Sequence, residues 1–426
     1  MNESARELQP ASSLHTVAWV LYDLANTIYS ASVTFLFFRY MASSTALGIT
    51  TTLSMVLAGF ATPLFASMAD RTGRAGTYCT FATLGCIGTM SLFGLLPGTA
   101  VGLLFTAYFL SNVFFQGALV FYNSLLPSVA RKRHMGLVSG IGVGLGYLGT
   151  IFVVLVPVQA QDRFGIRPAF LMAALMFLIC ALPCMIMVRD RRPIKPEPVN
   201  RQLFRSQWSE LIGTIRSLPK KPVLMWFLIA NFFAVDVLNT AIFFYGRFVE
   251  HSFLSLAEQG RLALAGHQFV TISDFMTVAG LAVTVPALLF GIVVGFLADR
   301  IGTVKAFGLS VLSLAGGLTG AAVFSGWSPL FFLLSMACFG GLGMAGIWTA
   351  GRKLLTELVP QEHLGRYFGL YGITNKVSIF GSMIFGILMD HLGTRIAVFS
   401  QVAALLVAFF CIIKMVKKRA EISGND

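Results

Sequence analysis

Three charged side chains lie inside long apolar stretches of this 426-residue sequence, at Asp23, Asp236 and Lys376. A charged side chain near the centre of a bilayer costs about 2.5–3.5 kcal/mol on insertion scales, so each of them needs a role that compensates this cost. A carboxylate that faces a wet cavity can accept a proton or hold an ammonium group, and a buried ammonium can pair with a carboxylate or bind that of a solute. The alternative for all three is a static hydrogen bond or ion pair that fixes helix packing.

Uncharged polar side chains accompany these charges at helical spacing. Asn239 lies one turn after Asp236, and three further polar residues share one face of the fourth expected helix. Such amides can hydrogen-bond a polar solute, or they can join neighbouring helices. The candidates for binding a substrate or a proton are Asp23, Asn26, Tyr29, Asn112, Gln116, Asn123, Asp236, Asn239 and Lys376.

The composition of the chain is that of a membrane protein. Hydrophobic residues make up 56% of it, charged residues 12%, and the mean hydropathy is +0.78. An ordinary soluble domain is about 45–50% apolar and about 25% charged. A soluble globule cannot cover so much apolar surface, and the same figures exclude a disordered chain, a disulfide-rich secreted fold and collagen. The sequence therefore predicts an all-α integral membrane protein.

Twelve apolar runs have the length to cross a bilayer, because about 20 helical residues span about 30 Å of hydrocarbon. They form two sets of six, so we expect twelve transmembrane helices in two pseudo-symmetric halves, residues 1–188 and 223–426. Residues 189–222, the connector, are expected to be a basic cytoplasmic linker with an amphipathic helix. The runs lie near 16–40, 47–69, 76–96, 100–126, 136–157, 168–188, 223–245, 272–297, 304–325, 329–350, 367–389 and 395–415.

The net charge of +13 is distributed unevenly across the membrane. Most of the 31 Lys and Arg fall in segments that the expected helices place on one side. The excess of positive charge on inner loops makes that side cytoplasmic, together with both termini. This distribution accounts for the charge without nucleic acid, which is not an expected partner. We expect a multi-pass protein of the cell membrane, the inner membrane if the source is bacterial.

The sequence offers no local signature of a cofactor, a metal site or an enzyme. The six cysteines fall in apolar runs with no adjacent His or carboxylate, so we interpret them as small core residues. The nucleotide-binding pattern Gly-x-x-x-x-Gly-Lys-Ser/Thr is absent from the sequence, which argues against ATP-driven pumping. Neighbouring nucleophile and base residues are absent as well. A monomer without cofactor is expected.

Two short charged loops repeat between the halves. An Asp-Arg-x-Gly sequence follows the second apolar run and again the eighth. An Asp-x-x-Asn-Thr sequence recurs in the first and seventh runs, at Asp23 and Asp236. Matching signals at matching places indicate parallel repeats related by an axis along the membrane normal. The charged residues of the two loops are candidates for a gate: Asp70, Arg71, Arg74, Asp299 and Arg300.

Glycines recur every four residues in the fifth expected helix, including Gly142 and Gly146, and others crowd the tenth. This spacing lets another helix backbone approach closely. We expect these glycines to form a sliding or rocking contact between the two halves.

These loops resemble the signature of the major facilitator superfamily, with departures at Ala66 and Thr303. Within it the chain resembles the vacuole-effluxer-like family, named after an autophagy-related fungal protein. The resemblance covers all twelve runs and is carried by residues 19–26, with a departure at Leu24, and by residues 121–127 and 139–149. It implies a loop that closes the cytoplasmic side, and fungal members export amino acids from the vacuole.

The resulting prediction is a secondary transporter that works by alternating access, with its site between the halves. We expect a small polar solute, an amino acid or similar zwitterion, with protons as a coupling ion. Among transporters, the alternative is a cation-coupled sugar symporter or a multidrug exporter. The 39 Phe residues would then line an apolar cavity that accepts many solutes. Outside transporters the alternatives are a membrane sensor or scaffold without transport, and then a membrane enzyme.

Overall fold

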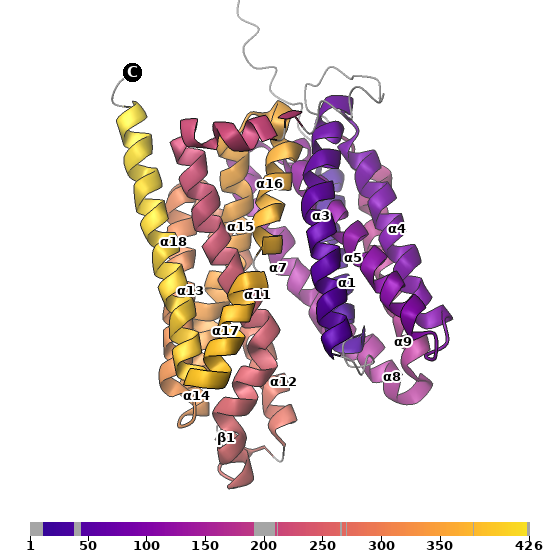
Figure 1. Ribbon diagram of the computed structural model, residues 1–426, viewed down its shortest axis with the longest axis vertical. Helices are drawn as coiled ribbons and strands as arrows, with labels where there is room; N and C mark the ends of the chain where they lie inside the picture. The colour runs from indigo at the N-terminus through magenta and orange to yellow at the C-terminus, as the bar shows by residue number, and fades with distance from the viewer. Residues whose placement is uncertain are drawn as a thin grey trace, which may run out of the picture. The chain divides into compact units, whose positions relative to one another are not determined.

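A computed structural model shows a helical chain that divides into two compact units (Figure 1). The first unit comprises Met1–Ser217 and Leu355–Lys376, and the second comprises Leu218–Leu354 and Val377–Asp426. The structure describes residues 12–37, 44–190, 209–210, 212–264, 266–269, 271–377 and 379–423.

The first unit contains six long helical stretches, some of them continued by short π-helical or 3-10 turns, and a helix from late in the chain. Its elements are α1 (Ser13–Ser32), η1 (Val33–Phe37), α3 (Ser44–Thr72), α4 (Ala75–Leu95), α5 (Val101–Ser124), α6 (Leu126–Val129), η2 (Lys132–His134), α7 (Met135–Val153), η3 (Val154–Val158), α8 (Gln159–Phe164), α9 (Ile166–Met187), η6 (Gln361–His363) and α16 (Leu364–Val377). Residues 212–217 of the connector are helical as well.

The second unit is built from long helices joined by short turns and by one two-stranded hairpin. Its elements are η4 (Leu218–Lys220), α11 (Pro222–Glu258), β1 (Ala263–Leu264), β2 (His267–Gln268), α12 (Ile272–Arg300), α13 (Thr303–Phe324), α14 (Pro329–Ser335), η5 (Met336–Gly340), α15 (Gly341–Leu358), α17 (Ile379–Leu392) and α18 (Thr394–Ser423). Strands β1 and β2 pair antiparallel. The division between the units falls within α15, after Leu354.

Ten helical segments are long and apolar enough to cross a membrane, within the part of the chain that the structure describes. This confirms an all-α membrane architecture. The other two predicted spans are 16–40, which falls on α1 with η1, and 367–389, which falls on α16 with α17. Neither is among the ten segments, and the described residues of the second are interrupted at position 378. A total of twelve spans stays a prediction.

Large apolar side chains lie on the outside of both units as well as in their cores. Phe81 and Phe60 are among the exposed ones, at 71% and 63%. A soluble protein rarely exposes extended apolar surface, whereas hydrocarbon accepts it without cost. Aromatic rings cluster inside the first unit, where Phe37 packs against Phe93 and Tyr108 in tilted geometry and against Phe170 edge-on.

In each unit the first long helix packs against two helices that come later in the chain. In the first unit α1 contacts α7 and α9, and in the second α11 contacts α17 and α18. Glycines allow the closest of these approaches. A Cβ on Gly149 of α7 would lie 2.6 Å from the carbonyl oxygen of Leu24 and 3.0 Å from the amide nitrogen of Ile28. Both atoms are backbone of α1, so neither can turn away.

The glycine contact differs from the predicted one. Gly142, Gly146 and Gly149 all face α1 of the same unit, and Gly343 faces Leu314 of α13 within the second unit. For Gly142, Gly146 and Gly343 the expectation of a contact between halves was wrong. Spacing of four predicts that a helix will come close, but it carries no information on which helix this is.

Gly149→Ala is expected to destabilise the protein by about 1–3 kcal/mol, because the added methyl group overlaps backbone atoms of α1. Gly88→Ala is the matched control, since a Cβ there meets nothing within 4 Å. The measurement is the thermal unfolding of the purified protein in detergent. Equal melting temperatures for the two variants would contradict the packing described here.

Candidate functional site

A tight turn separates α3 from α4 and places a buried carboxylate at the end of α3. Gly73 ends α3 with a φ of +64°, a conformation that side chains with a Cβ rarely adopt. Asp70 stands one turn before it, with 1% of its surface exposed. Because the turn is short, the carboxylate is held close to the end of the helix, where it meets a segment from far along the chain.

Asp70 binds the first turn of α16 through backbone amides. Its Oδ1 accepts a hydrogen bond from the amide of Gly365 and its Oδ2 one from the amide of Arg366, both at 2.8 Å. Helix N-termini present unpaired N–H groups and a partial positive charge, which a carboxylate satisfies. A Cβ on Gly365 would lie 2.6 Å from the same carboxylate, so glycine leaves the space that this approach needs.

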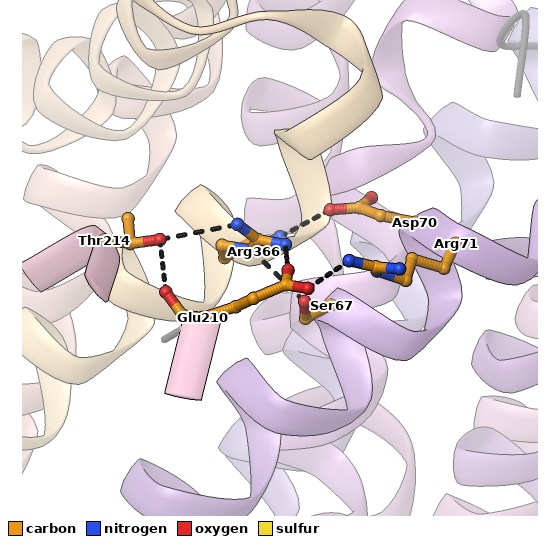
Figure 2. Close-up of polar contacts among 6 residues, drawn as sticks. All are labelled: Ser67, Asp70, Arg71, Glu210, Thr214 and Arg366. Carbon is orange, nitrogen blue, oxygen red and sulfur yellow. Dashed lines mark hydrogen bonds and ion pairs between the residues drawn. The ribbon is translucent and has the colours of Figure 1, made fainter. Parts of the chain in front are cut away.

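The side chain of Arg366 extends this contact into a group of six residues, the Asp70 cluster (Figure 2). Its guanidinium, buried with the rest of the residue, pairs with the carboxylate of Glu210. The other oxygen of Glu210 pairs with Arg71. The cluster thus joins two arginines to two carboxylates, and its formal charge is zero. Its members are Ser67, Asp70, Arg71, Glu210, Thr214 and Arg366, all of the first unit.

The second charged loop forms a different contact. Asp299, at the end of α12, accepts a hydrogen bond from the ammonium of Lys353 on α15 at 2.7 Å. Lys353 also donates to the carbonyl oxygen of Ala298 at 3.0 Å and is 5% exposed. Arg300 is exposed and its guanidinium lies 4.7 Å from the centre of the Phe296 ring. The two loops therefore look alike in sequence but hold different kinds of partner.

Arg74, the remaining gate candidate, is exposed and directly precedes α4.

Asp23 and Asp236, which lie in predicted spans, each lie against a glycine of a neighbouring helix in their own unit. Asp23 is 7% exposed, and a Cβ on Gly142 would lie 2.6 Å from its Oδ2. Asp236 is 6% exposed, and a Cβ on Gly381 would overlap its carboxylate. The amide of Gly381 donates a hydrogen bond to this carboxylate. The Oδ1 of Asp236 has no hydrogen-bond partner among the described residues.

The candidate residues Asn112, Tyr29 and Asn26 differ in whether their polar atoms have hydrogen-bond partners. Asn112 donates to the hydroxyl of Ser54 at 2.7 Å, and the hydroxyl of Tyr29 shares a 2.9 Å hydrogen bond with Ser111. Asn26 is 5% exposed, and neither its Nδ2 nor its Oδ1 has a partner in the described part of the chain.

The remaining candidates are less buried or lie outside the description. Gln116, Asn123 and Asn239 are half-buried, and the Oδ1 of Asn123 is buried without a partner among the described residues. The side chain of Lys376 lies outside the residues that the structure describes, although its backbone belongs to α16. Of the connector residues with helical apolar spacing, Phe204, Trp208 and Leu211 also lie outside.

Sequence reasoning did not identify Glu210, Arg366 or Lys353 as site residues. Glu210 is an acidic residue in a strongly basic connector, and this contrast is the one signal that marks it. Arg366 and Lys353 directly flank apolar runs, where basic residues are common for reasons of topology alone. In the described residues no group of three or more His, Cys, Asp or Glu side chains is arranged to hold a metal ion.

Comparisons with known proteins match the whole chain. A family described as "Vacuole effluxer Atg22 like" matches residues 25–423. The uncharacterized MFS-type transporter YxiO of Bacillus subtilis is 29% identical, over 90% of this chain and 91% of the relative. Autophagy-related protein 22 of Yarrowia lipolytica is 24% identical, over 67% of this chain and 51% of the fungal protein.

Solved structures share the fold at low sequence identity. A bacterial homologue of the iron transporter ferroportin, in an outward-facing state, gives a TM-score of 0.71 at 17% identity, over 95% of this chain and 98% of the other. The proton:xylose symporter XylE of the major facilitator superfamily gives a TM-score of 0.67 at 13% identity, over 93% of both chains. At these identities the likeness concerns the fold alone.

Asp299→Ala is expected to lower the free energy of unfolding by about 3 kcal/mol, because it leaves the buried ammonium of Lys353 without its carboxylate. Arg300→Ala, the next residue, removes an exposed charge and is expected to change it by less than about 0.5 kcal/mol. Both are measured as melting temperatures in detergent. A similar effect of the two substitutions would mean that the Lys353 ion pair contributes no stability of its own.

Proposed function

The chain belongs to the Atg22-like vacuole effluxer family, and we propose that it moves an amino acid or a similar zwitterion across the membrane by alternating access. Its relatives and its fold are those of multi-pass membrane transporters of the major facilitator type. The solute, the secondary active mechanism, proton coupling and the site residues are what is proposed here.

The observation that carries this proposal is the buried carboxylate of Asp236. One of its oxygens has no hydrogen-bond partner among the described residues, and the other meets the backbone at Gly381. An ionised carboxylate in such surroundings is costly unless a positive or hydrogen-bonding group satisfies it. The ammonium group of a solute supplies what is missing, and a proton does so when no solute is bound.

The first unit has polar groups of its own that we propose to bind a solute. The amide of Asn26 is buried with both its donor and its acceptor unused in the described part of the chain, three residues from the carboxylate of Asp23. An amide N–H donates to a solute carboxylate, and its carbonyl accepts from a solute ammonium. We propose Lys376, a lysine in the interior of an apolar run, as the charge that binds the solute carboxylate.

The Asp70 cluster supports alternating access because it stabilises one state of the protein. In the present structure the first turn of α16 is held by two amide hydrogen bonds to Asp70. Hydrogen bonds to a charged group contribute about 1.5–3 kcal/mol each. A bias of this size closes a gate firmly, and the binding of a solute can still reverse it. We propose that this cluster and the Asp299 loop form the cytoplasmic gate, with Arg74 and Arg300 at its surface.

The proposal includes the orientation of the protein in the membrane and its oligomeric state. We propose that the protein spans a cell membrane with both termini in the cytoplasm, and the excess of Lys and Arg in the expected inner segments supports this orientation. The chain is proposed to act as a monomer.

Asp236→Asn is expected to reduce counterflow uptake of a labelled amino-acid mixture into proteoliposomes at least tenfold, because the neutral amide cannot pair with an ammonium group. Lys376→Ala is expected to lose uptake to a similar extent. Saturable uptake by the wild type with loss in both variants supports a zwitterion site. Full uptake by Asp236→Asn would remove this carboxylate from the site.

The matched control is Asp274→Asn, which removes an exposed aspartate from the first turn of α12 and is expected to transport normally. A folded wild-type protein that takes up no amino acid would reject the proposed solute class. Competition by sugars or lipophilic cations would then identify a symporter or multidrug exporter. For coupling, an inward-directed pH gradient is expected to change uptake in the wild type and to have no effect on residual uptake in Asp236→Asn.

A further inference from the structure

We propose that Glu210 is a positioning residue through which the connector (residues 189–222) helps to keep the gate closed. The inference rests on the proposed function, in which the Asp70 cluster closes the gate. In this arrangement Glu210 holds the guanidinium of Arg366 in place, and Arg366 in turn keeps the first turn of α16 on Asp70. Neither the sequence repeat nor the two charged loops includes this residue.

The contacts of Glu210 connect three segments that are far apart in the sequence. One oxygen pairs with Arg71 on α3 and the other with Arg366 on α16. The partners are 139 and 156 residues away from it along the chain. Removal of this one carboxylate therefore removes an ion pair to each of two helices at once (Figure 2).

The charge balance of the cluster depends on Glu210. Asp70 directs its oxygens to the backbone amides of Gly365 and Arg366, which carry no net charge. The Arg366 side chain, 10% exposed, has the hydroxyls of Ser67 and Thr214 beside it at 3.2 and 3.4 Å. Among the described residues Glu210 is the carboxylate that its guanidinium contacts. Without it, the buried guanidinium retains two hydroxyl groups as its partners in the described part of the chain, and a buried charge with neutral partners is costly.

The local structure of the connector directs one face toward Arg366. Thr214 lies one helical turn after Glu210, and its hydroxyl donates to the carbonyl oxygen of Glu210 at 2.8 Å while accepting from Arg366. On other sides of the same turns Ile212 and Ile215 are each 46% exposed. The polar face is therefore the one used within the protein. When α16 leaves Asp70, Arg366 must part from Glu210 or the connector must move with it.

The test is hydrogen–deuterium exchange of the peptide that covers Gly365 and Arg366, in the full chain in nanodiscs. Their amides are the donors to Asp70, so their exchange rate reports directly on this contact. Glu210→Gln keeps the size of the side chain but removes its charge, and we expect about tenfold faster exchange. Glu210→Asp keeps the charge and is expected to restore at least part of the protection.

The matched control is Glu362→Gln, which removes an exposed carboxylate from η6, just before α16. It is expected to exchange like the wild type. A second measurement uses the wild type alone. Glu210 is 28% exposed and Arg71 30%, so salt screens their pairing. Protection of the peptide should fall as salt rises, and this dependence should be absent in Glu210→Gln.

Unchanged exchange in Glu210→Gln would overturn the inference, as would equal acceleration in Glu362→Gln, which would point to a general effect of surface charge. If Glu210→Gln does not fold, the salt dependence of the wild type and the Glu210→Asp variant decide the question. None of these readings requires transport. A wild type that takes up no amino acid rejects the proposed solute, whereas unchanged exchange rejects the role of Glu210.

Discussion

The structure depends on the constraint that every charge buried among apolar helices must meet a compensating group. Asp70 meets it with the amides of a helix N-terminus, Arg366 with Glu210, and Lys353 with Asp299. Each of these contacts holds together helices that apolar packing alone would not orient, because hydrocarbon and apolar side chains are equivalent surroundings. The positions of α16 and α15 are therefore fixed by charge, while glycine contacts set how closely their neighbours approach.

The same constraint separates the polar side chains of the helices into two groups. Asn112 and Tyr29 form hydrogen bonds to serines within the first unit. Asn26 and one oxygen of Asp236 form none among the described residues. Each group includes an asparagine, so the residue type alone does not decide to which group a side chain belongs. Satisfied groups contribute to packing, and unsatisfied ones are available to a polar solute. This difference is the basis for the solute class proposed above.

The sequence was sufficient to predict a helical membrane protein, its family and the two charged loops, because hydropathy and short motifs are local properties. The sequence was not sufficient to predict which groups the aspartates of those loops bind. The repeated Asp-Arg-x-Gly pattern suggested equivalent roles, yet Asp70 binds backbone amides and Asp299 binds Lys353. Backbone amides have no signature in a sequence, and Glu210 lies 156 residues from Arg366. Contacts of that separation follow only from the packed structure.

The Asp70 contact also constrains the order in which the chain can be completed during synthesis. The residues of α3 and α4 are made early, but the amides that Asp70 binds come 295 and 296 residues later. Lys353, in contrast, follows Asp299 by only 54 residues. Domains fold as they emerge, N-terminal parts first. The two amide donors that Asp70 uses in the finished structure are therefore made late in synthesis, and a product truncated before Leu355 lacks both of them.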